Sequence, residues 1–190
     1  MRVIGGKWKR RRLESSFGLN KASIIRPTTD RVKENIFNII ENLNTGNPLV
    51  GARVLDIFCG TGAMGLEALS RGADFCHFVD KSIMAKRISL QNIINLGAEK
   101  SSQFTMIDIL DLSHNNDLAS DLVFLDPPYE KNLGEKAISI LLKYGWVKRN
   151  AIFVLEKEIK SELSCDLKLI DQRKYGKTEI NILCAFDFKI

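Results

Sequence analysis

The sequence predicts an α/β protein built on a doubly wound, mostly parallel seven-stranded sheet with a C-terminal antiparallel hairpin. From residue 53 onward, short apolar segments typical of strands alternate with longer segments of helical periodicity. This alternation is typical of parallel strands joined by crossover helices. Residues 167–188 instead contain two strand-like segments around Gly176-Lys177, which indicates a hairpin at the end of the sheet.

Each element can be placed by its apolar pattern. We expect strands over residues 53–58, 75–79, 102–107, 121–125 and 151–155, followed by tail strands over 167–175 and 178–188. Helices are expected over 63–71, 82–96, 132–144 and 157–163. A further helix begins near Thr28 or Thr29, either of which can cap it. Its apolar face comprises Val32, Ile36, Phe37, Ile39, Ile40 and Leu43.

The composition is that of an ordinary globular protein. The chain has 190 residues, of which 45% are hydrophobic and 27% charged. Its apolar runs are too short for a membrane span, and its first residues lack the apolar core of a signal peptide. The four cysteines show no paired metal-binding spacing. We therefore expect a monomeric cytoplasmic protein with reduced cysteines, no bound metal and no membrane partner.

Positive charge is concentrated at the N-terminal end. Residues 1–33 carry ten Lys and Arg against two acids, a net charge of +8, whereas the whole chain carries +5. A basic arm on an acidic body indicates contact with a polyanion. We therefore divide the chain into a basic, RNA-binding extension with its helix (1–50) and a catalytic domain (51–190). The candidate RNA-binding residues are Arg2, Lys7, Lys9, Arg10, Arg11, Arg12, Arg26, Thr28 and Arg31. Lys33 is a further candidate for phosphate or substrate, and the alternative for Arg26, Arg31 and Lys33 is a purely structural role at the helix start. The apolar Val3, Ile4, Trp8 and Leu13 indicate that the arm also docks or forms a strand.

A glycine turn after the first predicted strand indicates a cofactor site. The spacing Gly60-x-Gly62-x-x-Gly65 joins a strand to a helix, as in dinucleotide-binding proteins. Asp56 precedes this turn, and Asp80 ends the next strand, where an acid can bind a ribose. A pyrophosphate would be repelled by Asp56, whereas a cationic ligand would be attracted. The pattern therefore favours S-adenosylmethionine, which carries a sulfonium and an amino group, over NAD.

Two further predicted strands are followed by residues that could bind the cofactor or the substrate. Asp108 follows the third predicted strand, where it can bind an adenine amino group or cap a helix. The fourth strand is followed by Asp126-Pro127-Pro128-Tyr129. The prolines stiffen the chain, so that the Asp126 side chain and the Pro127 carbonyl can both accept protons from one exocyclic amine while Tyr129 stacks on the base. These acceptors would direct the nitrogen lone pair at a methyl sulfonium.

These motifs resemble a known family. Asp126-Pro127-Pro128-Tyr129 after Asp56-Ile57-Phe58-Cys59-Gly60-Thr61-Gly62 is similar to the amino-methyltransferase pattern of the class I, Rossmann-like fold. The segments 2–8, 26–34, 62–71 and 174–178 resemble the RsmD family of 16S rRNA guanine-N2 methyltransferases, so that the resemblance covers nearly the whole chain. It implies methyl transfer from S-adenosylmethionine to a guanine of ribosomal RNA within an assembled or assembling small subunit. The chain departs from the family at Asp80, where most members carry Glu.

The predicted site combines these motifs. The methionine end of the cofactor is assigned to Asp56, Gly60 and Gly62, and Phe58 is a further candidate for cofactor binding. The ribose is assigned to Asp80 and the adenine to Asp108, and Lys81 and Ile109 are further candidates for cofactor binding. The catalytic residues are Asp126, Pro127, Pro128 and Tyr129.

Three alternatives remain at this point. An enzyme that methylates N6 of adenine in RNA or DNA would share the same motif. An NAD-dependent oxidoreductase would explain the glycine turn but neither the Asp-Pro-Pro-Tyr segment nor the basic arm. A non-enzymatic RNA-binding protein would explain the arm but not an intact cofactor motif.

Overall fold

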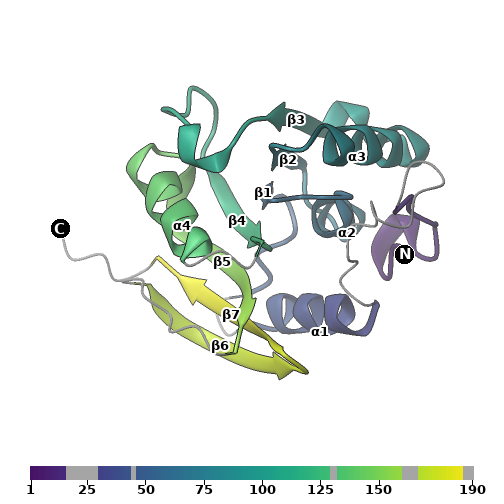
Figure 1. Ribbon diagram of the computed structural model, residues 1–190. Coiled ribbons are helices and arrows are strands. Elements are labelled where there is room, and N and C mark those ends of the chain that lie inside the picture. Colours follow the sequence, from purple (N-terminus) through teal and green to yellow (C-terminus); the bar gives the residue numbers. More distant parts are fainter. Residues whose placement is uncertain (16–29, 44–45, 129–131, 160–166, 186–190) are drawn as a thin grey trace.

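The computed structural model describes residues 1–15, 30–43, 46–128, 132–159 and 167–185, which form a mixed sheet with helices on both faces (Figure 1). The described residues contain seven strands: β1 Arg53–Ile57, β2 Phe75–Asp80, β3 Ser102–Met106, β4 Ser120–Leu125, β5 Val147–Glu158, β6 Lys168–Tyr175 and β7 Thr178–Cys184. Their order in the sheet is β3-β2-β1-β4-β5-β7-β6.

The pairing of the strands confirms the predicted sheet. Strands β3, β2, β1, β4 and β5 pair in parallel, and β7 pairs antiparallel with both β5 and β6. The chain moves outward from β1 through β2 to β3 and then returns to β4 on the other side of β1. Such a reversal leaves a crevice at the carboxyl ends of the two central strands, where ligands bind in open α/β sheets. The strand order therefore predicts a ligand site at the carboxyl ends of β1 and β4.

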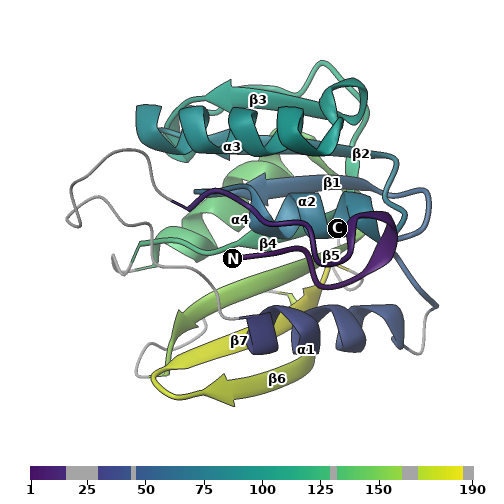
Figure 2. The ribbon, with the colours of Figure 1, turned by 90° about the vertical axis from the view of Figure 1, so that its right-hand side faces the viewer.

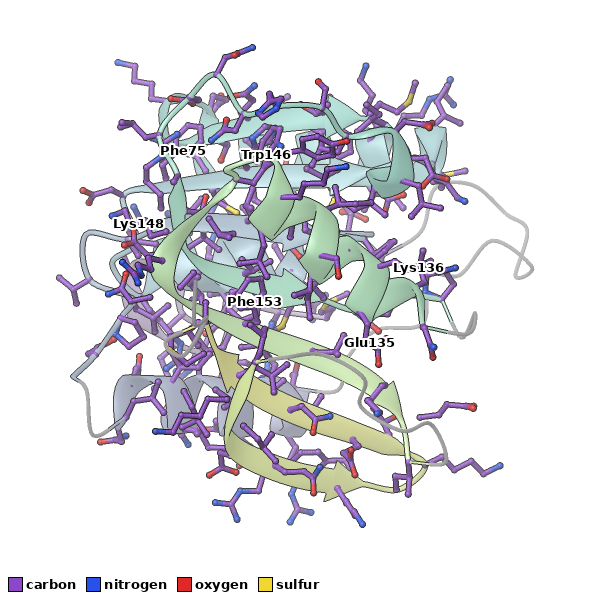
Figure 3. The ribbon with its side chains drawn as sticks, turned by 90° about the vertical axis from the view of Figure 1, so that its left-hand side faces the viewer. Phe75, Glu135, Lys136, Trp146, Lys148 and Phe153 are labelled. Carbon is purple, nitrogen blue, oxygen red and sulfur yellow. The ribbon has the colours of Figure 1, made fainter. Side chains whose placement is uncertain are left out.

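The helices divide unequally between the two faces. Helices α1 Asp30–Glu41, α2 Ala63–Ser70 and α3 Ile83–Leu96 lie on one face, and α4 Leu133–Lys143 lies on the other (Figures 1 and 2). Figure 3 shows the face that α4 covers, with Glu135 and Lys136 near the start of that helix and Phe153 of the sheet. Each face has its own apolar cluster, one around Phe37 and Phe78 and the other around Leu141 and Phe153. None of the helices in the described ranges is long and apolar enough to cross a membrane.

The N-terminal arm docks on the protein, as its apolar residues predict. Residues 1–15 fold back on themselves around a short 3-10 turn, Gly6–Trp8, and Arg2 pairs with Arg12 in an antiparallel bridge. Val3 and Leu13 are buried in the cluster beneath α1 and α2. Figure 2 shows the arm running across α2, between α3 and α1. The division of the chain at residue 50 stays a prediction.

The prediction of a helix at Lys157 and Glu158 is wrong. The helix predicted over residues 157–163 begins with Lys157 and Glu158, which instead continue β5. Their backbones pair with Glu179 and Thr178 of β7, so the distant hairpin extends the strand beyond its apolar segment. Residues 160–163 lie outside the described part of the chain, as do the Thr28 and Thr29 caps. Strand β7 spans Thr178–Cys184, and residues 186–188 of the predicted strand lie outside the described part of the chain.

Candidate active site

The predicted glycine turn lies at the carboxyl end of β1. Gly60 and Gly62 have φ angles of 53° and 74°, in the left-handed region that glycine adopts without strain. The Gly62 amide donates to the Cys59 carbonyl oxygen (2.7 Å), which closes the turn before α2. A Cβ atom at Gly65 would lie 2.4 Å from the Cys76 sulfur, so glycine at this position lets α2 pack closely on β2. Phe58, at φ 58°, is half-buried in the turn.

Asp56 is a buried carboxylate beneath this turn. Its Oδ2 accepts a hydrogen bond from the Gly65 amide (2.8 Å), and the residue is only 3% exposed. Burial raises the pKa of Asp56 from 3.8 to about 8, the Gly65 hydrogen bond opposes this rise, and the nearby Asp126 and Asp80 add to it. The described groups that shift the pKa of Asp56 include no positively charged side chain. The site therefore holds a carboxylate that a cationic ligand would stabilise in its charged form.

Asp80 joins the end of β2 to the glycine turn. Its Oδ2 accepts from the Gly60 amide (3.0 Å), and its Oδ1 accepts from the Ser82 amide (2.8 Å). A carboxylate has about four lone-pair sites, so two backbone donors leave acceptor capacity for a hydroxyl group. This geometry is compatible with the ribose-binding role predicted from the sequence.

Asp108 follows β3 and acts as a cap in this structure. Its Oδ1 accepts from the Leu110 amide (3.1 Å), and its Oδ2 lies 3.0 Å from the Lys81 ammonium. The Leu110 hydrogen bond and then the Lys81 interaction lower the pKa of Asp108, which keeps it ionised. Ile109 is buried in the cluster beneath α4. Asp56, Asp80 and Asp108 thus mark the ends of three neighbouring strands, although their cofactor roles stay predictions.

The Asp-Pro-Pro segment directly follows β4. Asp126 and Pro128 are exposed and Pro127 is half-buried, whereas Tyr129 lies outside the described residues. Because β4 pairs with β1, Asp126 lies close to Asp56, where it contributes to the raised pKa of that carboxyl. The topology therefore brings the proposed catalytic acceptor to the same edge as the glycine turn.

The basic side chains of the arm lie on its outer surface. Lys7, Lys9, Arg10 and Arg12 are exposed, as is Arg31 at the start of α1. Two others also make contacts: Arg2 pairs with Asp30 (2.9 Å), and Arg11 donates to the Asn95 carbonyl oxygen (2.9 Å). Arg26 and Thr28 lie outside the described residues.

Sequence reasoning missed the residues that hold the arm in place. The buried Glu67 of α2 accepts hydrogen bonds from the amides of Ile4 and Gly5, both at 2.7 Å. Its carboxylate also lies 3.4 Å from the Lys33 ammonium and 2.8 Å from Arg71 Nε. We call Glu67, Lys33, Arg71 and these two amides the arm contact. An acid within the apolar run of α2 was the one signal of it in the sequence.

Lys33 is therefore wrong as an RNA-binding candidate. Its side chain is 0% exposed, and its ammonium donates to the Arg2 carbonyl oxygen (2.6 Å) as well as facing Glu67. Burial lowers its pKa, and the attraction of Glu67 opposes that effect. Lys33 joins α1 to the arm instead.

A second polar link connects the arm to the glycine turn. Asn92 of α3 is fully buried, and its Oδ1 accepts from the Glu14 amide (2.7 Å). Its Nδ2 donates to the carbonyl oxygens of Glu14 and Thr61, both at 3.0 Å. One side chain thus contacts both the arm and the proposed cofactor loop.

Comparison with known proteins agrees with this architecture. Residues 1–184 match the family described as conserved hypothetical protein 95. The chain is 34% identical to ribosomal RNA small subunit methyltransferase D of Escherichia coli K12, over 86% of this chain and 77% of that protein. It is 37% identical to the protein of the same name in Haemophilus influenzae, over 83% of this chain and 79% of that protein. A solved structure titled "Putative methyltransferase yhhF from Escherichia coli" superposes with a TM-score of 0.79 at 29% identity, covering 97% of each chain.

Proposed function

This chain belongs to the RsmD family of methyltransferases, and from that premise we propose that it transfers a methyl group from S-adenosylmethionine to N2 of a guanine in small-subunit ribosomal RNA. The observation that carries the proposal is the position of Asp126-Pro127-Pro128 directly after β4, beside Asp56 and the glycine turn. The substrate is proposed to be the RNA within an assembled or assembling subunit.

The residues at the carboxyl ends of the parallel strands are compatible with this cofactor. Asp56, Phe58, Gly60 and Gly62 would hold its methionine end, where the buried carboxylate favours a cationic group. Asp80 with Lys81 would hold the ribose, and Asp108 with Ile109 the adenine. The Asp80 oxygens each accept one backbone hydrogen bond, which fixes the carboxylate while leaving room for a hydroxyl donor. When bound, S-adenosylmethionine supplies an electrophilic methyl group.

The residues after β4 would prepare the amine for attack. The exocyclic nitrogen of guanine is a poor nucleophile because its lone pair is delocalised into the ring. The Asp126 carboxylate and the Pro127 carbonyl would each accept one N2–H, orient the nitrogen and favour its pyramidal form. After transfer the nitrogen is cationic and releases its proton to water, so that the exposed Asp126 need not act as a base of raised pKa. Tyr129 is proposed to stack on the base.

The basic outer surface of the arm would attract the RNA. Lys7, Lys9, Arg10 and Arg12 are exposed on a segment that is itself bound to α2, so their positive charges are held at one place on the surface. Contacts of such side chains with phosphate are independent of sequence and fix position and orientation. The choice of guanine would then depend on the pocket next to Asp126.

Mass mapping of methylated nucleosides in 16S rRNA tests this function. RNA from cells that lack the protein is expected to lose one N2-methylguanosine, and the wild-type gene is expected to restore it. Asp126→Ala should fail to restore it while the purified variant still binds S-adenosylmethionine. Asp126→Asn keeps an acceptor oxygen and should retain more activity than Asp126→Ala. An unchanged methylation pattern in the deletion strain would refute the proposal.

A further inference from the structure

A small cavity lies beside Asp126, between the carboxyl end of β4 and residues Val154 and Glu156 of β5. Its volume is about 20 Å³, which is room for one water-sized group. Three carboxylates line it, those of Asp56, Asp126 and Glu156, and apolar side chains such as Phe124 and Met64 make up the rest. A cavity of this size can receive the polar edge of a ligand but not a whole ring. Glu156 has no role so far in the proposed chemistry.

The sheet places Glu156 next to Asp126. Leu125 of β4 pairs with Leu155 of β5 in parallel register, so the residues that follow them are neighbours on adjacent strands. Adjacent strands lie about 5 Å apart, a separation that one planar base edge can bridge. Glu156 is half-buried, and its backbone pairs with Ile180 of β7. Its position is therefore set by a central strand, unlike that of a side chain on a loop.

The edge of guanine that carries N2 also carries a second donor. N1–H lies directly beside the N2 amino group, whereas adenine has an unprotonated N1 acceptor at the corresponding position. A carboxylate accepts a hydrogen bond from N1–H and repels an N1 lone pair. If Asp126 and Pro127 hold the amine, the neighbouring acceptor would face N1. We propose that Glu156 accepts the N1–H of the substrate guanine and thereby selects guanine over bases with an unprotonated N1.

This inference rests on the proposed function, and it assigns Glu156 a specificity role within that site. In the described ranges, no three or more His, Cys, Asp or Glu side chains are grouped so that they could hold a metal ion. Two carboxylates on neighbouring strands repel each other when both are ionised. A ligand edge that brings donors to both offsets that repulsion.

The test compares guanine with 2,6-diaminopurine, which keeps the reacting N2 amine but has an unprotonated N1. Small-subunit RNA is assembled by ligation with either base at the mapped position and reconstituted into particles. The two substrates compete for one enzyme, so any loss of folded protein cancels from the preference. The wild type should prefer guanine by about 10- to 100-fold, the range expected for a hydrogen bond to a charged group. Glu156→Gln, whose amide can donate to an unprotonated N1, should reduce that preference at least tenfold.

Glu158→Gln is the matched control, because Glu158 is an exposed acid on the same strand that does not line the cavity. It should keep the wild-type preference. Equal use of both bases by the wild type, or an unchanged preference in Glu156→Gln, would overturn the assignment of Glu156 while leaving guanine N2 methylation intact. Methylation of adenine N6 with none at guanine N2 would overturn both the proposed function and this inference, and nucleoside mass spectrometry tells the cases apart.

Discussion

Two carboxylates are buried near α2, and the protein balances their charges in different ways. Glu67, in the arm contact, is 0% exposed and faces the Lys33 and Arg71 cations and two backbone amides. Asp56, near the carboxyl end of β1, is 3% exposed and accepts a hydrogen bond from the Gly65 amide. The described groups that shift its pKa include no positively charged side chain. The first carboxylate is neutralised within the fold. The second is mostly protonated at pH 7 without a ligand, and a bound cation would stabilise its charged form.

The largest effect is expected at Glu67. Glu67→Gln leaves the buried Lys33 ammonium without its counter-charge, and removing one partner of a buried ion pair costs about 3–5 kcal/mol. Urea unfolding should show this loss in the free energy of unfolding. The exposed Glu99→Gln is the control and should stay within about 0.5 kcal/mol of the wild type. A loss at Glu67 no larger than at Glu99 would show that the two buried carboxylates do not differ as described.

A smaller, pH-dependent effect is expected at Asp56. Its pKa is raised on folding from 3.8 to about 8, so its contribution to stability is present below about pH 4 and is lost as the pH rises to about 8. Asp56→Asn keeps an oxygen for the Gly65 amide but cannot ionise. The variant should therefore gain stability relative to the wild type as the pH rises from 4 to 6, by about 2–3 kcal/mol at about 1.4 kcal/mol per pH unit. Thermal unfolding of the ligand-free proteins across this range measures the difference, and parallel curves would contradict the raised pKa.

The smallest effect on stability is expected at the outer surface of the arm. Replacing Lys7, Lys9 and Arg12 by Gln removes exposed charges and should change the free energy of unfolding by less than about 0.5 kcal/mol. RNA affinity should fall, and the slope of log affinity against log salt should become shallower by about 0.7–0.9 for each phosphate that the variant no longer neutralises. Filter binding at several salt concentrations provides the measurement. An unchanged slope in the folded variant would mean that the arm does not bind the RNA.

Local patterns in the sequence predicted the elements, and long-range contacts account for what was missed. The strand, glycine turn and helix around residues 53–71 follow from neighbouring residues, and so does the hairpin at Gly176-Lys177. The arm contact joins Glu67 to amides more than sixty positions away, which no local pattern reveals. The sequence leaves Lys33 open between phosphate contact and a structural role at the helix start, because it does not show which basic side chains are buried.

The end of β5 shows the same limit. Residues 157–158 carry a helical pattern but pair with β7, some twenty positions further along the chain. The proximity of Asp126 to Asp56 could be anticipated because parallel strands place their carboxyl ends at one edge. Their separate roles could not, since the raised pKa of Asp56 depends on burial beneath a helix packed closely through Gly65.

Proton release on cofactor binding tests most directly whether a ligand cation completes the Asp56 site. Titration calorimetry of S-adenosylmethionine at pH 7, in buffers of different ionisation enthalpy, counts the protons released. The wild type should release close to one proton more than Asp56→Asn, because a carboxyl group with a pKa of about 8 is mostly protonated at pH 7 and ionises beside a bound cation. The free ligand is the same in both experiments, so its own ionisation before binding cancels. Equal proton release by the two proteins would contradict the account.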